Sequence, residues 1–172
     1  MTPPHRVAAV GVSARRVAFV CLDVDLQVVD LRVWYLRRLR RWEAKSSRVC
    51  DRLPRSLRES EPRRLLIEKP VCLPQQADAL RLADAIADCA RSQGYHTERM
   101  SFQTACVEIV GEFNAKRCAE VLAAQYEPLA GRIAQPVAKW RACDDRIRDR
   151  RSMLAAAAIA HAAVMGELAR RP

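Results

Sequence analysis

The stretch RRLLIEKP, residues 63–70, holds a short run of leucine and isoleucine that ends in one carboxylate and is stopped by a proline. An apolar run of this length before Pro70 predicts a buried strand. Glu68 is the last residue of that run, so the pattern places a single carboxylate at the end of a sheet. Glu68 is therefore the first candidate site residue.

Three apolar runs precede this stretch. Residues 6–13 (RVAAVGVS) are almost wholly apolar, which is typical of a strand buried on both faces. Residues 17–23 (VAFVCLD) follow after a short turn and residues 26–35 (LQVVDLRVWY) come two residues later. Their tight spacing predicts an antiparallel meander of three strands.

Helical periodicity begins after the meander. Residues 36–53 place apolar side chains on one face and arginines on the remainder, which predicts a basic amphipathic helix ended by Pro54. A polar stretch then leads to the strand with Glu68, which we expect to run parallel to an earlier strand. Residues 75–93 predict a helix stopped by Gly94, and residues 95–102 a last strand.

The C-terminal third is mostly helical. Residues 104–110 predict one or two turns, and Asn114 is a cap for a helix over residues 115–125. Pro128, Gly131 and Pro136 predict a loop before a final alanine-rich helix over residues 144–168. The order of elements predicts one α/β domain over residues 1–172 with an RNase H-like fold, a five-stranded mixed sheet flanked by helices.

Composition points to an anionic partner. Thirty Lys and Arg against twenty Asp and Glu give a net charge of +10, and arginine suits phosphate. A basic surface common to an arginine-rich proteome is the alternative explanation. Seven dispersed cysteines without a C-x-x-C pair are typical of a reducing compartment. No apolar run approaches the ~18 residues of a membrane span, and residues 1–12 lack a signal-peptide layout. We expect a cytoplasmic protein with no membrane partner.

Three short motifs, in this order and spacing, resemble RuvC-type Holliday junction resolvases. They are Ile67-Glu68, Val110-Gly111 followed by Asn114-Ala115-Lys116, and the segment over residues 155–161. The resemblance runs over most of the chain. It implies a homodimer acting on branched DNA, with two-metal phosphodiester hydrolysis by four carboxylates, of which the first aspartate bridges the ions.

The chain departs from that pattern at three of the four carboxylates. Ser13 stands where the first aspartate is expected, unless an Asp-Pro pair has been deleted between Val12 and Ser13. Arg150 and Met153 align with the two acidic residues of the last helix. A hydroxyl is a poor bridge between two hard cations, and an arginine repels a metal ion. Glu68 alone remains, so we expect no metal and no other cofactor.

An active site from shifted residues is the second hypothesis. Asp145 and Asp149 are four residues apart on one helix face, so a one-turn slip of about 5.4 Å would present them to Glu68 and retain Mg²⁺. Asp23 lies at the far end of its strand, at roughly 3.3 Å per residue, and is expected to be out of reach. An acidic, solvated helix start is the alternative interpretation of Asp144, Asp145 and Asp149.

Without metal, Glu68 is expected to pair with Arg15, Arg16 or Arg150, which would explain a carboxylate at a buried strand end. His161 is expected to be a packed or hydrogen-bonded helix residue rather than a catalytic base.

The first hypothesis is a non-catalytic, resolvase-like protein that binds branched or structured DNA by its phosphates. The third is a scaffold for protein partners, with solvated arginines. The candidate DNA contacts are Arg15, Arg16, Arg37, Arg38, Arg40, Arg41, Lys116 and Arg117.

Overall fold

The computed structural model describes residues 5–70, 76–133 and 145–170, with the side chains of residues 145–149 outside that description. It contains one five-stranded mixed sheet with strand order β3-β2-β1-β4-β5. The first three strands are antiparallel neighbours, while β4 runs parallel to both β1 and β5. The strands are β1 (Arg6–Ser13), β2 (Arg16–Asp23), β3 (Val28–Tyr35), β4 (Arg64–Glu68) and β5 (Thr97–Met100). The predicted meander and the parallel return are confirmed.

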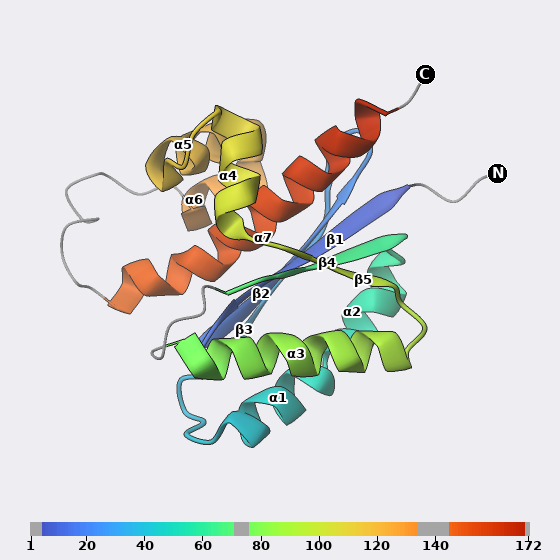
Figure 1. Ribbon diagram of the computed structural model, residues 1–172, viewed down its shortest axis with the longest axis vertical. Coiled ribbons are helices and arrows are strands. Elements are labelled where there is room, and N and C mark those ends of the chain that lie inside the picture. Colours follow the sequence, from blue (N-terminus) through green and yellow to red (C-terminus); the bar gives the residue numbers. More distant parts are fainter. Residues whose placement is uncertain (1–4, 71–75, 134–144, 171–172) are drawn as a thin grey trace.

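Helices cover both faces of the sheet (Figure 1). The helices are α1 (Trp42–Cys50), α2 (Leu53–Ser60), α3 (Ala77–Ser92), α4 (Phe102–Val110), α5 (Ala115–Gln125), α6 (Glu127–Ile133) and α7 (Asp145–Leu168). The first three pack on one face and the last four on the other. Alternate residues of each strand therefore enter different cores, as Val7 and Ala8 do. This explains why β1 and β2 are almost wholly apolar.

The last helix lies directly on the central strand. A Cβ added at Gly11 would stand 1.9 Å from the carbonyl oxygen of Ser152, so only glycine fits there. The following alanines, residues 155–158, are fully buried. Small side chains on both elements thus bring the backbone of α7 against β1, which sets the height of the helix above the sheet.

The predicted helix over residues 36–53 is wrong at both ends. Residues 36–41 form a loop, and Pro54 lies in the first turn of α2 instead of ending a helix. Proline is tolerated in a first turn because its missing N–H would have no helical acceptor there. Leu36 is buried and its N–H donates to the carbonyl of Arg15 at 2.8 Å, which holds the chain beside the β1–β2 hairpin.

The prediction of a loop at residues 128–136 is also wrong in its first half. Pro128 and Gly131 belong to α6, whose Leu129 and Ile133 are buried in the core. Core packing of these two side chains outweighs the weak helix propensity of the segment. Pro136 lies outside the described residues. The caps agree with prediction: Asn114 accepts from the N–H of Arg117 at 3.0 Å, and Gly94 has a φ of +85° after α3.

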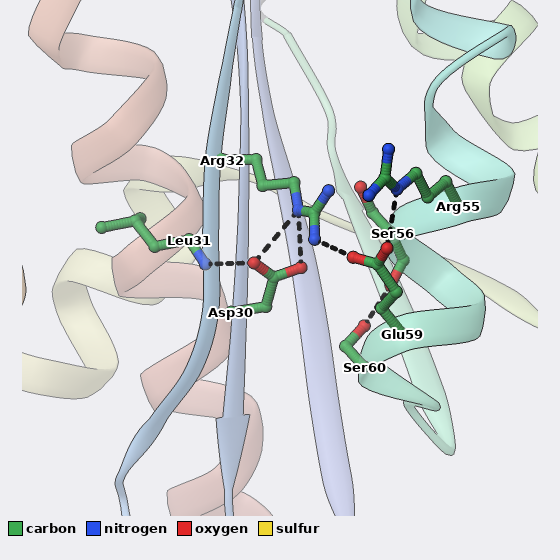
Figure 2. A network of polar contacts seen from close by, with 7 residues as sticks. All are labelled: Asp30, Leu31, Arg32, Arg55, Ser56, Glu59 and Ser60. Carbon is green, nitrogen blue, oxygen red and sulfur yellow. Dashed lines mark hydrogen bonds and ion pairs between the residues drawn. The ribbon is translucent and has the colours of Figure 1, made fainter.

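A polar network joins β3 to α2 (Figure 2). The Nε of Arg32 donates to Asp30 at 2.9 Å, and its guanidinium also contacts Glu59. Arg55 donates to Glu59 at 2.7 Å. The network attaches α2 to the open edge of the sheet, although ion pairs as exposed as these contribute little to stability.

The described residues also bear on the expectations about cysteines and about membrane spans. Their five cysteines, Cys21, Cys50, Cys89, Cys106 and Cys118, carry free thiols. None of the helices in the described ranges is both long and apolar enough to cross a membrane.

Candidate functional site

Four residues at one end of the sheet form a row across four neighbouring strands. Ser13 pairs with Arg16, and Arg16 pairs with Tyr35. Glu68 ends β4, which runs parallel to β1, so it lies at the same end. By strand alternation all four face α7, since Ala9, Ala18, Val33 and Leu66 of the same strands contribute to the core beneath that helix. We call these four residues the terminal row.

Glu68 is the buried carboxylate of the terminal row. It is 2% exposed, and its Oε2 accepts the backbone N–H of Val12 at 2.7 Å. Burial raises the pKa of Glu68, and the Val12 N–H and the Arg151 guanidinium oppose that rise only in part. The cation 3.8 Å from its Oε1 is Arg151. The sequence-based expectation named Arg150, one residue earlier, as well as Arg15 and Arg16.

Ser13 closes the hairpin. Its hydroxyl accepts from the N–H of Arg16 at 3.1 Å and donates to the carbonyl of the same residue at 2.9 Å. This bonding is typical of a serine that stabilises a turn through the nearby backbone. A hydroxyl held in this way supplies a neutral oxygen where a bridging metal ligand would need an anion.

The first turns of α7 carry the other positions that the resemblance assigns to metal ligands. Met153 is 2% exposed and packs in the core. Arg150 has its pKa lowered by burial and by the neighbouring Arg16. A cationic and a thioether side chain do not suit a Mg²⁺ ion.

Among the side chains that the structure describes, no three His, Cys, Asp or Glu residues gather in a group able to hold a metal ion. The described donors therefore do not fit the metal centre that the resemblance implies. Asp145 and Asp149 lie within α7, but their side chains fall outside the description, as does Asp144 altogether. The shifted carboxylate set remains a prediction.

Asp23 lies at the opposite end of the hairpin. It pairs with Arg6, and its Oδ1 accepts the N–H groups of Asp25 at 3.0 Å and Gln27 at 2.8 Å. It ends β2 and stabilises the turn that follows, at the opposite end of the strand from the terminal row, as its expected distance from Ser13 predicted.

Six of the predicted DNA contacts gather at the end of the sheet that holds the terminal row. Arg15 and Arg16 belong to the β1–β2 hairpin, and the loop over residues 36–41 starts beside it through the Leu36–Arg15 hydrogen bond. Burial and the charge of Arg37 lower the pKa of Arg16, while Tyr35 opposes the shift. The exposed members are Arg15, Arg37, Arg38, Arg40 and Arg41. We call the six arginines the basic end.

The other two predicted contacts lie elsewhere. Lys116 and Arg117 lie in the first turn of α5, which lies away from the hairpin end in Figure 1. Lys116 is 3.7 Å from Glu120, and Arg117 is 3.9 Å from Glu112. The fold does not bring this pair to the basic end, and its role as a DNA contact stays a prediction.

A pocket of about 360 Å³ opens beside the terminal row. Three arginines line it from three elements: Arg16 from β2, Arg132 from α6 and Arg150 from α7. The remaining lining residues are Val33, Tyr35, Gly131 and Met153. The Arg16 guanidinium lies 4.4 Å from the centroid of the Tyr35 ring. We call this cavity the arginine pocket.

Sequence reasoning missed Arg132, Arg151 and Tyr35. Arg132 was hidden because its segment was predicted to be a loop, and no local pattern marks it as a partner of the hairpin. The charged run at residues 146–151 (RIRDRR) was a usable signal for Arg151. Tyr35 ends the predicted third strand, but only the sheet register places it beside Arg16.

His161 has a structural role. Its Nδ1 lies 2.7 Å from the hydroxyl of Tyr126. Burial lowers the pKa of His161 and raises that of Tyr126, so both shifts favour a hydrogen bond between a neutral imidazole and a neutral phenol. The expectation of a hydrogen-bonded helix residue is confirmed.

Comparisons of the sequence with protein-family models and with curated proteins find no match. The structure is similar to Thermus thermophilus RuvC in complex with a Holliday junction substrate, with a TM-score of 0.71 and 12% identity over 96% of this chain and 97% of the other. Another Thermus thermophilus RuvC structure matches with a TM-score of 0.66 and 13% identity, over 95% of this chain and 96% of the other. The yeast mitochondrial Holliday junction resolvase matches with a TM-score of 0.53 and 13% identity, over 96% of this chain and 82% of the other. At these identities the likeness establishes the fold, so the predicted RNase H-like fold is confirmed.

Proposed function

We propose that this protein binds branched DNA through the basic end of its sheet and does not cleave it. The observation that carries the proposal is that six arginines, from the β1–β2 hairpin and from the loop after β3, lie at the same end of the sheet as the terminal row. Permanently charged guanidinium groups suit phosphate oxygens, and a net charge of +10 favours association with a polyanion. Binding of this kind follows the shape of the backbone and reads few base edges.

The absence of cleavage rests on the chemistry of the terminal row. Ser13 is neutral and engaged in the hairpin turn, and Glu68 is buried with a raised pKa. Arg150 brings positive charge to a position where a divalent cation would need an anion. Two-metal hydrolysis requires anionic oxygen ligands that share the ions, and these residues do not supply them.

An active, Mg²⁺-dependent endonuclease is the second candidate. It is favoured by the placement of Asp145 and Asp149 in the first turns of the helix that carries Arg151 to Glu68. In that case Glu68, Asp145 and Asp149 would hold the ion, and Glu68→Gln would abolish cleavage.

A gel shift separates these functions. A four-way junction and a duplex of equal length are compared at two salt concentrations, with EDTA or with Mg²⁺, and the products are then denatured. Junction-selective binding that weakens with salt and leaves the strands intact supports the proposal. Mg²⁺-dependent nicking that Asp145→Asn removes would establish the enzyme instead. No binding at low salt would leave the protein-scaffold function.

The resemblance also implies a homodimer, which we propose as the binding form. Light scattering of the free protein and of its junction complex gives the stoichiometry directly. A monomer in both states would contradict this part of the proposal. The cytoplasmic location stays a prediction.

A further inference from the structure

We propose that the arginine pocket binds the phosphate group of a single unpaired nucleotide, with guanidinium groups in place of metal ions. The inference rests on the proposed function, because it assigns a discrete ligand to a cavity beside the DNA-binding surface. It goes further in naming a nucleotide monophosphate as a ligand that the protein holds without a divalent cation.

The first argument is convergence of charge. Arg16, Arg132 and Arg150 come from a strand and two helices and line one cavity. Burial and the proximity of Arg16 lower the pKa of Arg150, so the two cations lie close enough to repel. Planar guanidinium forks match phosphate oxygens, so three converging arginines suit a phosphate group.

The second argument is the mismatch with a metal. The resemblance assigns metal ligands to Arg150 and Met153, and the described side chains there hold no carboxylate cluster. In a metal-dependent nuclease the metal ions neutralise the charge of the phosphate. Here three arginines bring positive charge to the corresponding end of the sheet. Among the described side chains, the site therefore has cationic groups suited to phosphate and no group of oxygen ligands for the ions.

The third argument is the aromatic wall. Tyr35 is 58% exposed although Arg16 stacks on its ring at 4.4 Å. An exposed aromatic face beside a phosphate site is a platform for a base, and such stacking tolerates any base. Val33 and Met153 add apolar surface to the same lining.

The size of the cavity sets the ligand class. About 360 Å³ is near the lower end of the range typical of small-ligand pockets, roughly 300–1,000 Å³. Such a space accepts one nucleotide and excludes a duplex. A nucleotide that enters must therefore be unpaired, as at a branch point or a strand end.

The test is calorimetric titration with 2′-deoxyadenosine 5′-monophosphate in EDTA. We expect one site per chain, with deoxyadenosine binding at least about 10-fold more weakly because it lacks the phosphate. The variants test which side chains hold the nucleotide. Arg132→Gln is expected to weaken mononucleotide binding about 10-fold. Arg132 is exposed, so this change spares the core. Arg91→Gln removes a matched exposed arginine from α3 and should leave binding unchanged. Tyr35→Leu should weaken the nucleotide more than it weakens inorganic phosphate.

Three results would overturn the inference: equal binding by Arg132→Gln and the unaltered protein, a strict need for Mg²⁺, or no difference between nucleotide and nucleoside. The junction gel shift, run on the same preparations, separates this inference from the proposed function. Junction binding without mononucleotide binding rejects the pocket alone. Mononucleotide binding without junction binding rejects the proposed function and supports the pocket as a small-ligand site.

Discussion

The backbone N–H of Val12 donates to the carboxyl Oε2 of Glu68 at 2.7 Å, joining the ends of two parallel strands that are 56 residues apart in the chain. The bond gives the buried carboxyl a partner that needs no metal ion. Together with Arg151 at 3.8 Å, it explains how an acidic side chain persists at a buried strand end.

Glu68→Gln should leave the protein as stable as before, or more stable, at neutral pH. Burial raises the folded-state pKa of Glu68, so the folded protein keeps the carboxyl proton at pH values where the unfolded chain has lost it. Its contribution to stability is therefore complete at acid pH and is lost as the pH rises through the folded pKa. Urea unfolding from pH 4 to pH 8 should show this slope in the unaltered protein and not in the variant.

Glu98→Gln is a control in which the pKa shift, and therefore the pH dependence of stability, has the opposite sign. The hydrogen bond from Arg64 lowers the pKa of Glu98, so its contribution is present above the unfolded pKa and is lost as the pH falls. This variant should lose stability at neutral pH. A similar loss in Glu68→Gln would mean that the charged form of Glu68 is the one the fold requires.

Gly11→Ala should destabilise the protein by at least about 2 kcal/mol, because the new methyl group would overlap the carbonyl of Ser152 and displace α7. Gly166→Ala, in the same helix with open space at its Cβ, should be neutral or stabilising by up to about 1 kcal/mol. The free energies of unfolding come from urea titrations. Equal effects of the two changes would show that α7 does not touch β1 at Gly11.

Tyr126→Phe should cost about 1 kcal/mol at neutral pH, since it removes the buried hydrogen bond to His161. Burial lowers the folded-state pKa of His161, so its contribution is present above the unfolded pKa of about 6.5 and is lost as the pH falls. An NMR titration of the imidazole in the native protein and in urea measures the difference. A native pKa of His161 at or above that in urea would contradict the neutral imidazole.

Replacing Arg38 and Arg41 together by Gln should weaken junction binding and reduce the slope of log affinity against log salt by about one to two. Both are exposed in the loop of the basic end, so folding should be unaffected. The matched control replaces Arg58 and Arg91, exposed on α2 and α3. If the control lowers affinity and slope equally, binding follows net charge and the basic end has no special role.

Much of the fold follows from local patterns. The nearly unbroken apolar runs of β1 and β2, the short turn between them and the strand ending at Glu68 each lie within a few residues, and the predicted strands match the observed ones. The alanine-rich segment of α7 was also recognisable as a helix, because alanine has the highest helix propensity. The loop over residues 36–41 was missed because its arginines and leucines also satisfy helical spacing. Only the burial of Leu36 beside Arg15 decides against a helix.

The sequence by itself determined most of the element types, the mixed sheet, the excess of arginine and the position of Glu68 at a strand end, because these depend on spacing and residue chemistry. Tertiary structure decided what surrounds Glu68: the N–H of Val12 and the guanidinium of Arg151. It also brought Arg132 to Arg16 and Arg150. These contacts join residues far apart in the chain, and their geometry depends on sheet register and on how closely α7 packs at Gly11, quantities that no local pattern contains.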